Sequence, residues 1–310
     1  NMLEAVAGTY RILDNYYLFG RNIPVWGDLL GDNTYISASN SSRLLSFNNY
    51  SYVSNSAEIL QMWSQSYYAI LQANRVLATE LPESANVSQL KGEALGIRAM
   101  LYLYLVNYFG KSATANPTAD GVPVVTIPTN IGGAFIKPAR SKVSEVYDQI
   151  IADLNEAFNI MPDAGTTLHA ANTNFISKYA VKALLARTYL YKGDYENARK
   201  AALEVVEKGG YSLAADETAF KSYWASGVAR TDKLETIFEI NNSATANNGV
   251  EGIDWMYTTL GDVLATDNLY SLYSATDLRQ GLIVQAARGA NTVNYINRYQ
   301  NTGNADRDTC

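Results

Sequence analysis

The sequence predicts an all-α protein in which helical hairpins support a long, irregular, loop-rich region packed on them. Three observations favour this class. The 310 residues include only 21 glycines and 7 prolines, which is few for an all-β or loop-dominated chain. Apolar residues recur in several segments with the 3.6-residue period of an amphipathic helix. Two of those segments are joined by a Gly-Asp turn, which is typical of an antiparallel helical hairpin.

The first part of the chain is predicted to contain two helices separated by a long excursion. Apolar residues from Leu3 to Leu13 recur at helical spacing, so the chain opens on an amphipathic helix. Residues 20–56 are rich in Asn, Ser and Gly, and we expect a surface excursion with a short helical turn at 26–30. A helical pattern returns over residues 58–77.

The next two helices have serine residues at their predicted starts. Ser88 is expected to cap a helix that ends at Gly110 and is apolar almost all round, so this helix should be buried. Ser141 is expected to cap a helix with an apolar stripe over residues 143–158.

The chain after residue 211 has weaker patterns. Residues 234–240 are interpreted as a short strand, and residues 241–253 as a loop rich in Asn, Gly and Ala. Residues 266–274 are predicted to form one more short helix. We expect these elements to be laid over the helical part.

The hairpin formed by predicted helices 178–192 and 195–208 matches the tetratricopeptide (TPR) pattern. Ala186 and Ala198 are small where two antiparallel helices approach closely, and Gly193 allows a sharp turn. An earlier helix repeats part of this spacing around residues 99–102, without the turn. The prediction is therefore of TPR-type hairpins, and an ordinary helical hairpin stays open as the alternative.

Composition excludes several classes of function. The net charge of −6 and the isoelectric point near 5.0 argue against a nucleic-acid partner or binding to anionic lipids, because both need clustered Lys and Arg. The longest apolar run, residues 99–106, is much shorter than the ~20 residues of a membrane-spanning helix. Cys310 is the single cysteine, so the chain has no disulfide framework and no cysteine-based metal site.

Several motifs in order along the chain resemble the SusD/RagB family. The segment 63–74 has the pattern W-x-x-x-Y-x-x-I-x-x-A-N, and the segment 93–110 has the pattern E-A, R-A-x-x-Y and N-Y-F-G. The segment 138–154, the TPR hairpin and the segment 235–240 continue the series in the same order. The chain is therefore identified as similar to this family over residues 58–240.

The resemblance implies a SusD-like α-α superhelix in a single domain over residues 1–310. The helical scaffold is expected at about 1–20, 57–110 and 138–210, and the ligand-binding, loop-rich part at about 21–56 and 211–310. Family members are longer and carry a C-terminal helical region and a lipidated N-terminal cysteine. Since neither is present in this sequence, and Cys310 is at the wrong end, we expect the chain to be truncated.

The family resemblance also implies a function. Such proteins bind oligosaccharides or polysaccharides at the cell surface and deliver them to a TonB-dependent, SusC-like transporter. They are lipid-anchored in the outer membrane of Bacteroidetes, so the only membrane attachment expected is an N-terminal lipid absent from this chain. The family contributes no catalytic residues, so we expect a binding protein without a cofactor and not an enzyme.

The expected ligand is a glycan held on aromatic side chains with polar neighbours, because sugar rings stack on flat aromatics and their hydroxyls need hydrogen-bond partners. The family has no residue motif for this site that carries over, so the candidates are nominated from the two loop regions. They are Trp255, Tyr257 and Asn248 from the later loop, and Tyr35, Asn40 and Arg43 from the earlier one.

Two other functions stay open at this point. An α/α-toroid glycosidase or lyase would need two carboxylates facing each other, and Asp28 and Asp32 are a candidate pair, although capping or surface roles suit them better. A TPR scaffold that binds peptides is the second alternative. The single histidine, His169, is interpreted as a plain loop residue. A structural calcium ion held by loop carboxylates also stays open.

Overall fold

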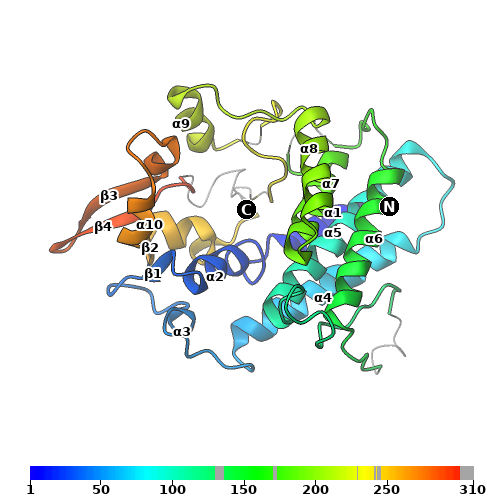
Figure 1. Ribbon diagram of the computed structural model, residues 1–310, viewed down its shortest axis with the longest axis horizontal. Helices are drawn as coiled ribbons and strands as arrows, with labels where there is room; N and C mark the ends of the chain where they lie inside the picture. Colours follow the sequence, from blue (N-terminus) through cyan, green and yellow to red (C-terminus); the bar gives the residue numbers. More distant parts are fainter. Residues whose placement is uncertain (130–135, 170–172, 229, 241, 243–245, 301–310) are drawn as a thin grey trace. The chain divides into compact units, whose positions relative to one another are not determined.

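The computed structural model describes residues 1–129, 136–169, 173–228, 230–240, 242 and 246–300. The described chain is mostly helical, which confirms the predicted fold class, and it adds a small sheet (Figure 1). Contacts between Cα atoms divide it into two compact units. Unit 1 comprises Asn1–Ile12, Trp63–Ser212 and Thr231–Phe238, and unit 2 comprises Leu13–Met62, Leu213–Arg230 and Glu239–Cys310. The expected single domain over the whole chain stays a prediction.

Unit 1 contains the long helices. These are α1 (Met2–Leu13), most of α4 (Ala57–Leu77), α5 (Ala85–Phe109), α6 (Val143–Ile160), α7 (Lys178–Lys192) and α8 (Tyr195–Lys208).

Unit 2 contains shorter helices and the strands. Its elements are α2 (Asn22–Leu30), β1 (Thr34–Ile36), α3 (Leu45–Asn48), α9 (Glu217–Ala225), η2 (Gly249–Glu251), η3 (Trp255–Thr259), β2 (Val263–Ala265), α10 (Asp267–Leu272), η4 (Leu278–Leu282), β3 (Ile283–Arg288) and β4 (Asn291–Ile296).

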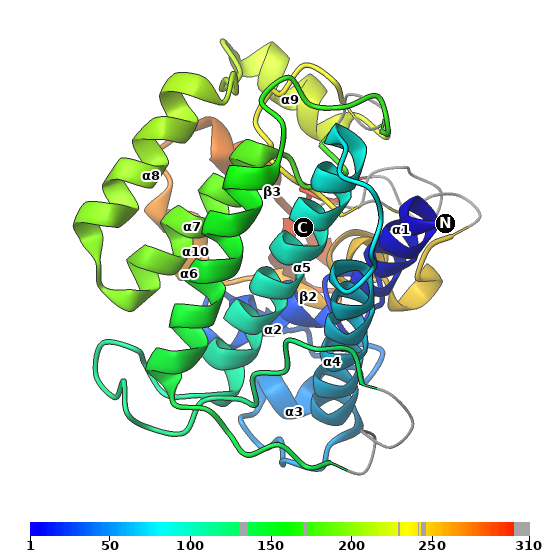
Figure 2. The same cartoon turned by 90° about the vertical axis from the view of Figure 1, so that its right-hand side faces the viewer.

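The helices α5 to α8 lie side by side in chain order, each packed on the next (Figure 2). The hairpin of α7 and α8 has the predicted ends. Gly193 has φ +81 and ends α7 in the left-handed conformation that glycine adopts without a steric penalty. Asp194 then caps α8, because its carboxylate accepts a hydrogen bond from the backbone N–H of Asn197 at 3.2 Å. The predicted helices 178–192 and 195–208 are therefore confirmed.

Two predicted helix caps are wrong. Ser84, not Ser88, caps α5, and its hydroxyl accepts from the backbone N–H of Val87 at 3.2 Å. The helix thus begins earlier than its apolar pattern suggested. Lys142, not Ser141, is the N-cap residue of α6. Its backbone N–H donates to the carboxylate of Glu145 at 2.7 Å.

A buried ion pair joins α5 and α6 in unit 1. The guanidinium of Arg98 donates to both carboxylate oxygens of Asp153, at 2.8 and 2.6 Å, and the two side chains are only 7% and 2% exposed. Arg98 also donates to Asn74 Oδ1 at 2.8 Å, and Asn74 donates to the backbone carbonyl of Val125 at 2.9 Å. This cluster therefore connects α4, α5, α6 and the extended segment after α5 through buried polar contacts.

The sheet of unit 2 has the strand order β1-β2-β4-β3, and all neighbours are antiparallel. In its register Tyr35 stands opposite Leu264, and Leu264 stands opposite Tyr295. None of these four strands was predicted. The strand predicted at 234–240 is wrong, because Leu234 forms only an isolated bridge with Ser212. The short helix predicted at 266–274 is confirmed as α10.

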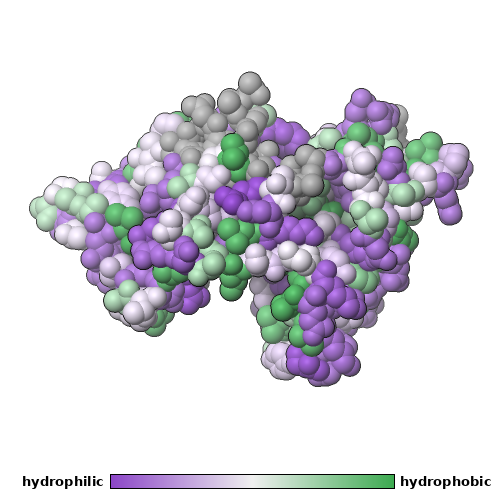
Figure 3. Space-filling model, turned by 90° about the horizontal axis from the view of Figure 1, so that it is seen from above, coloured by the Kyte–Doolittle hydropathy of each residue, from purple (hydrophilic) through white to green (hydrophobic). Residues whose placement is uncertain are grey.

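No helix in the described part of the chain is long and apolar enough to cross a membrane. On the face shown in Figure 3, hydrophobic residues lie in small groups among hydrophilic ones. Isolated exposed apolar residues of this kind are normal on a protein surface.

Candidate functional site

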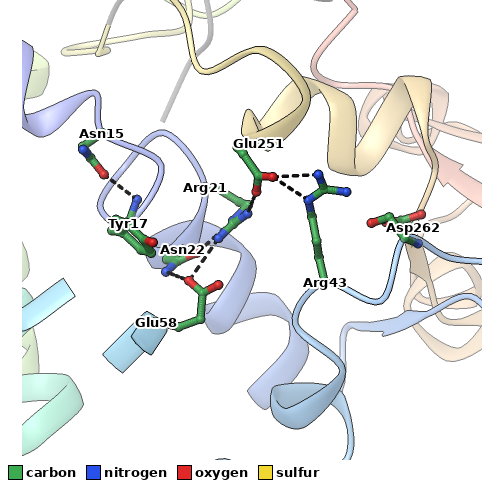
Figure 4. A network of polar contacts seen from close by, with 9 residues as sticks. Asn15, Tyr17, Arg21, Asn22, Arg43, Glu58, Glu251 and Asp262 are labelled. Carbon is green, nitrogen blue, oxygen red and sulfur yellow. Dashed lines mark hydrogen bonds and ion pairs between the residues drawn. The ribbon is translucent and has the colours of Figure 1, made fainter. Parts of the chain in front are cut away.

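A network of four charged side chains lies in unit 2 (Figure 4). Arg21, at the start of α2, is 1% exposed and pairs with Glu58 of α4 at 3.0 Å and also with Glu251 of η2. Glu251 in turn accepts from Nε and Nη2 of Arg43, at 2.9 and 2.6 Å. Asn22 donates to Glu58 at 2.9 Å. The network therefore joins four separate stretches of the chain, around residues 21–22, 43, 58 and 251.

Glu251 and Arg43 stabilise each other's ionised forms. The hydrogen bonds from Arg43 and the neighbouring guanidinium of Arg21 lower the pKa of Glu251, and these effects outweigh the opposing effect of burial. Glu251 likewise raises the pKa of Arg43. Arg43 lies between Glu251 and Asp262 (Figure 4), and it directly precedes the segment 44–53. The network therefore fixes one end of that segment.

Three aromatic rings form a continuous stack that joins α2 to the segment 44–53. The ring of Trp26 stacks on Phe47 at a centroid distance of 4.3 Å and an interplanar angle of 19°. Phe47 stacks on Tyr52 at 5.0 Å and 14°. Trp26 and Phe47 are buried, whereas Tyr52 is 40% exposed. The stack thus runs from the core of unit 2 to its surface, and a buried ring supports the exposed one from behind.

Further exposed residues surround Tyr52 in the chain. Tyr50 and Val53 are each 58% exposed, and the hydroxyl of Tyr50 donates to Asp32 Oδ1 at 2.9 Å. This hydrogen bond raises the pKa of Tyr50, with a smaller contribution from the neighbouring Tyr52. We call the exposed ring of Tyr52, together with Tyr50, Val53 and Asp32, the Tyr52 platform.

The backbone around the Tyr52 platform is strained. Asp32, Ser42, Leu44 and Tyr50 have φ between +53 and +66, and these values belong to the left-handed region. Such a conformation is unusual for bulky residues such as Leu and Tyr, and costs on the order of 1–3 kcal/mol at each position. Strained residues of this kind persist where the surrounding structure holds them, and they concentrate at ligand sites.

Three of the nominated residues have polar groups that are engaged within unit 2. Arg43 pairs with Glu251, as described above. The side-chain amide of Asn248 donates to the backbone carbonyl of Asp14 at 2.7 Å. Asn40 donates to the carbonyl of Ser37 and accepts from the N–H of Ser42 at 2.7 Å, which makes it part of a turn. Arg43 and Asn248 are connected through Glu251, whose N–H donates to the Asn248 carbonyl.

The three nominated aromatic residues differ in exposure. Tyr257 is 1% exposed, stacks on Tyr299 and donates to Asp28 at 2.6 Å, so its ring packs inside unit 2. Trp255 is half-buried, and its indole N–H has no hydrogen-bond partner among the described residues. Tyr35 is 37% exposed and stands on β1 in the same cross-strand row as Tyr295. The roles of all six nominated residues as ligand contacts stay predictions.

Sequence patterns did not identify Tyr52 and Phe47 as a unit. Residues 20–56 were predicted to form a surface excursion, but Trp26, Phe47 and Tyr52 meet only when α2 and α3 pack against each other. A signal in the sequence was the concentration of Trp, Phe and Tyr in an otherwise polar segment. That composition is characteristic of surfaces that use rigid aromatic side chains for contact.

The two carboxylates considered for a glycosidase, Asp28 and Asp32, are bound to different tyrosines. Asp28 accepts from Tyr257, while Asp32 accepts from Tyr50. Burial raises the pKa of Asp28, and the Tyr257 hydrogen bond partly offsets that effect. Within the described ranges no three His, Cys, Asp or Glu side chains come together as a metal site. The expectation that the protein needs no cofactor stays a prediction, and so does the calcium alternative.

His169 is not a plain loop residue, so that interpretation is wrong. Its Nε2 lies 3.0 Å from Oε1 of the fully buried Glu93, and its ring stacks on Phe175 at 3.7 Å. Tyr10 and Gln89 also hydrogen-bond to Glu93. The loop after α6 therefore packs back onto α5 through this histidine.

One unit is helical and contains a TPR-type hairpin, and the other is loop-rich and contains an aromatic stack that ends in the exposed ring of Tyr52. These features define a helical binding protein of the SusD-like class. Residues 7–190 match the SusD-like family model described as "Starch-binding associating with outer membrane". This match covers more than half of the chain. The chain belongs to the SusD-like family.

Individual relatives agree with this assignment. SusD-like protein P2 of Formosa agariphila is 24% identical over 265 residues, which are 84% of this chain and 49% of that protein. The chain therefore spans about half the length of this curated relative. A SusD superfamily protein from Bacteroides thetaiotaomicron has a similar fold, with a TM-score of 0.82, 22% identity and coverage of 98% and 71%. A laminarin-binding SusD-like protein also has this fold, with a TM-score of 0.71, 22% identity and coverage of 97% and 70%.

Proposed function

We propose that this protein captures oligosaccharides or polysaccharides on unit 2, with the ring of Tyr52 as a stacking surface. Membership of a carbohydrate-binding family supports the proposal. The observation that carries it within the molecule is the stack of Trp26, Phe47 and Tyr52, because a ring supported from behind loses little freedom when a sugar stacks on it. The half-buried Trp255 and the exposed Tyr35 are candidate secondary contacts.

The proposal includes a place and a partner in the cell. We infer that the protein acts at the outer-membrane surface, attached by a lipid, and passes the glycan to a TonB-dependent, SusC-like transporter. The description of the family as associating with the outer membrane supports this placement. We expect the protein to deliver the glycan without cleaving it.

Affinity electrophoresis and calorimetry with soluble glycans test the binding proposal. The panel contains starch and laminarin, and the variants are Tyr52→Ala and Trp255→Ala. Tyr191 is the matched control because it is another exposed tyrosine, 48% exposed, but it lies on α7 of unit 1. We expect Tyr52→Ala to weaken binding at least about fivefold, since a central aromatic contact typically contributes more than ~1 kcal/mol. Tyr191→Ala should bind like the wild type.

Three results would contradict the proposal. Equal losses in the Tyr52 and Tyr191 variants would show that the platform is not the site. Accumulation of new reducing ends during incubation would favour the glycosidase alternative. Failure of the protein to co-purify with a TonB-dependent transporter, when both are produced in a Bacteroidetes host, would refute the delivery step.

A further inference from the structure

The excess negative charge of the protein is confined to one of its two units. Unit 1 contains 16 acidic and 16 basic residues, so its formal charge is zero. The described residues of unit 2 contain 12 acidic and 7 basic residues, which gives a net charge of −5. Unit 2, which contains the Tyr52 platform, is therefore acidic, whereas unit 1 has no net charge.

The basic residues of unit 2 already have partners. Arg21, Arg43, Lys221 and Arg279 pair with carboxylates. Arg288 donates to the backbone carbonyls of Leu260 and Ser39, and Arg298 and Arg230 lie over aromatic rings. Arg and Lys donors that can turn to the ligand are the strongest side-chain partners of a sulfate or carboxylate. Arg21 and Arg43, which precede the segment 44–53 in the chain, are held by Glu58 and Glu251, whereas Lys221 and Arg279 form exposed pairs on other elements of the unit.

The immediate surroundings of the platform are acidic as well. The sequence contains no Lys or Arg between Leu44 and Asn74, a stretch that includes the whole segment 44–53. Asp32 is exposed and is hydrogen-bonded to Tyr50, whose hydroxyl also interacts electrostatically with Tyr52. A carboxylate at this position accepts hydrogen bonds from sugar hydroxyls and repels anionic substituents.

We propose that the Tyr52 platform selects uncharged glycans and rejects uronic acid and sulfated polymers, with Asp32 as the residue that determines this specificity. The inference rests on the proposed glycan-binding function. Tyr52 supplies stacking that does not depend on charge, so it cannot discriminate by itself. Asp32 discriminates because it gains a partner when a hydroxyl approaches and meets a like charge when a carboxylate or sulfate approaches.

The test compares neutral and anionic polymers in low-salt buffer. The neutral probes are starch, laminarin and xyloglucan, and the anionic probes are alginate and carrageenan. The central variant is Asp32→Asn, because Asn tolerates the left-handed conformation of residue 32, where φ is +59, and retains an acceptor oxygen. Asp148→Asn, an exposed aspartate on α6 of unit 1, is the control for lost charge alone.

The expected pattern is specific. The wild type binds at least one neutral probe and neither anionic probe, and Tyr52→Ala loses the neutral one. Asp32→Asn gains about fivefold or more in affinity for an anionic probe at low salt, since a like charge at about 4 Å has roughly that effect. The gain shrinks as salt rises. Asp148→Asn behaves like the wild type.

Two outcomes overturn the inference, and they differ in whether the proposed glycan binding survives. Tight, Tyr52-dependent binding of an anionic probe by the wild type overturns the charge selection while glycan binding stands. Absence of binding to every probe, with all variants folded by circular dichroism, overturns the proposed function and the inference with it.

Discussion

The strongest stability prediction concerns the buried pair of Arg98 and Asp153. Replacing Asp153 with Asn keeps the shape of the side chain but removes its charge and puts an N–H₂ group or a neutral oxygen opposite the guanidinium. Breaking a buried ion pair from one side costs about 3–5 kcal/mol. Arg98 keeps its hydrogen bonds to Asn74 at 2.8 Å and to the carbonyl of Thr126 at 3.3 Å, so we expect the lower end of that range.

Thermal unfolding followed by far-ultraviolet circular dichroism measures this effect, because the pair lies among the long helices of unit 1. A loss of about 3 kcal/mol corresponds to a fall of roughly 6–12 °C in melting temperature for a unit of this size. The control is Asp148→Asn on the same helix, which breaks an exposed pair with Lys192 and should have little effect. Equal shifts in the two variants would refute the reasoning, because burial would then not matter.

The remaining stability predictions concern Glu251 and Gly193. The pKa of Glu251 is lowered in the folded state, so its contribution to stability is present above its unfolded pKa and is lost as pH falls through the folded pKa. The advantage of the wild type over Glu251→Gln in melting temperature should therefore stay constant from pH 7 down to about 5 and narrow as pH falls below the ordinary value of 4.5. A gap that stays constant down to about pH 3 would contradict this. Gly193→Ala should destabilise by about 1–2 kcal/mol, because φ is +81 there and the new Cβ would lie 2.7 Å from Cγ2 of Thr114. Gly8→Ala in α1, where a Cβ meets nothing within 4 Å, should be neutral or stabilising in the same melting experiment.

Local patterns in the sequence were sufficient to predict that the helices of unit 1 exist, but not where each of them begins. The hairpin around Gly193 was predicted with its ends because glycine and the Asp194 cap act on their immediate neighbours. The start of α5 was misplaced because Ser84 and Ser88 are both competent caps, and the apolar stripe begins only with the later one. The choice of Ser84 adds a helical turn that is rich in polar residues and has no periodic pattern.

The sheet and the platform depend on contacts that a local pattern does not contain. Strands β1 and β2 have three residues each, which is too short for an alternation to be recognised. The stack of Trp26, Phe47 and Tyr52 forms between separate elements. Arg43 and Asn248 were nominated because polar groups in loops can bind sugars, and the folded chain gives both groups partners inside the unit that no local pattern contains.

The antiparallel pairing of β1 with β2 has a consequence for how the protein is made. Thr34 pairs with Ala265, which follows it by 231 residues, whereas α5 to α8 each contact the next helix along the chain. Contacts between distant residues close large loops and form slowly, while local helical contacts form early. On the ribosome the helices can associate as they emerge, but β1 must wait until β2 has been synthesised, 231 residues later than Thr34. Until then β1 has no neighbouring strand, and the exposed aromatic residues of the segment 44–53 are at risk of aggregation.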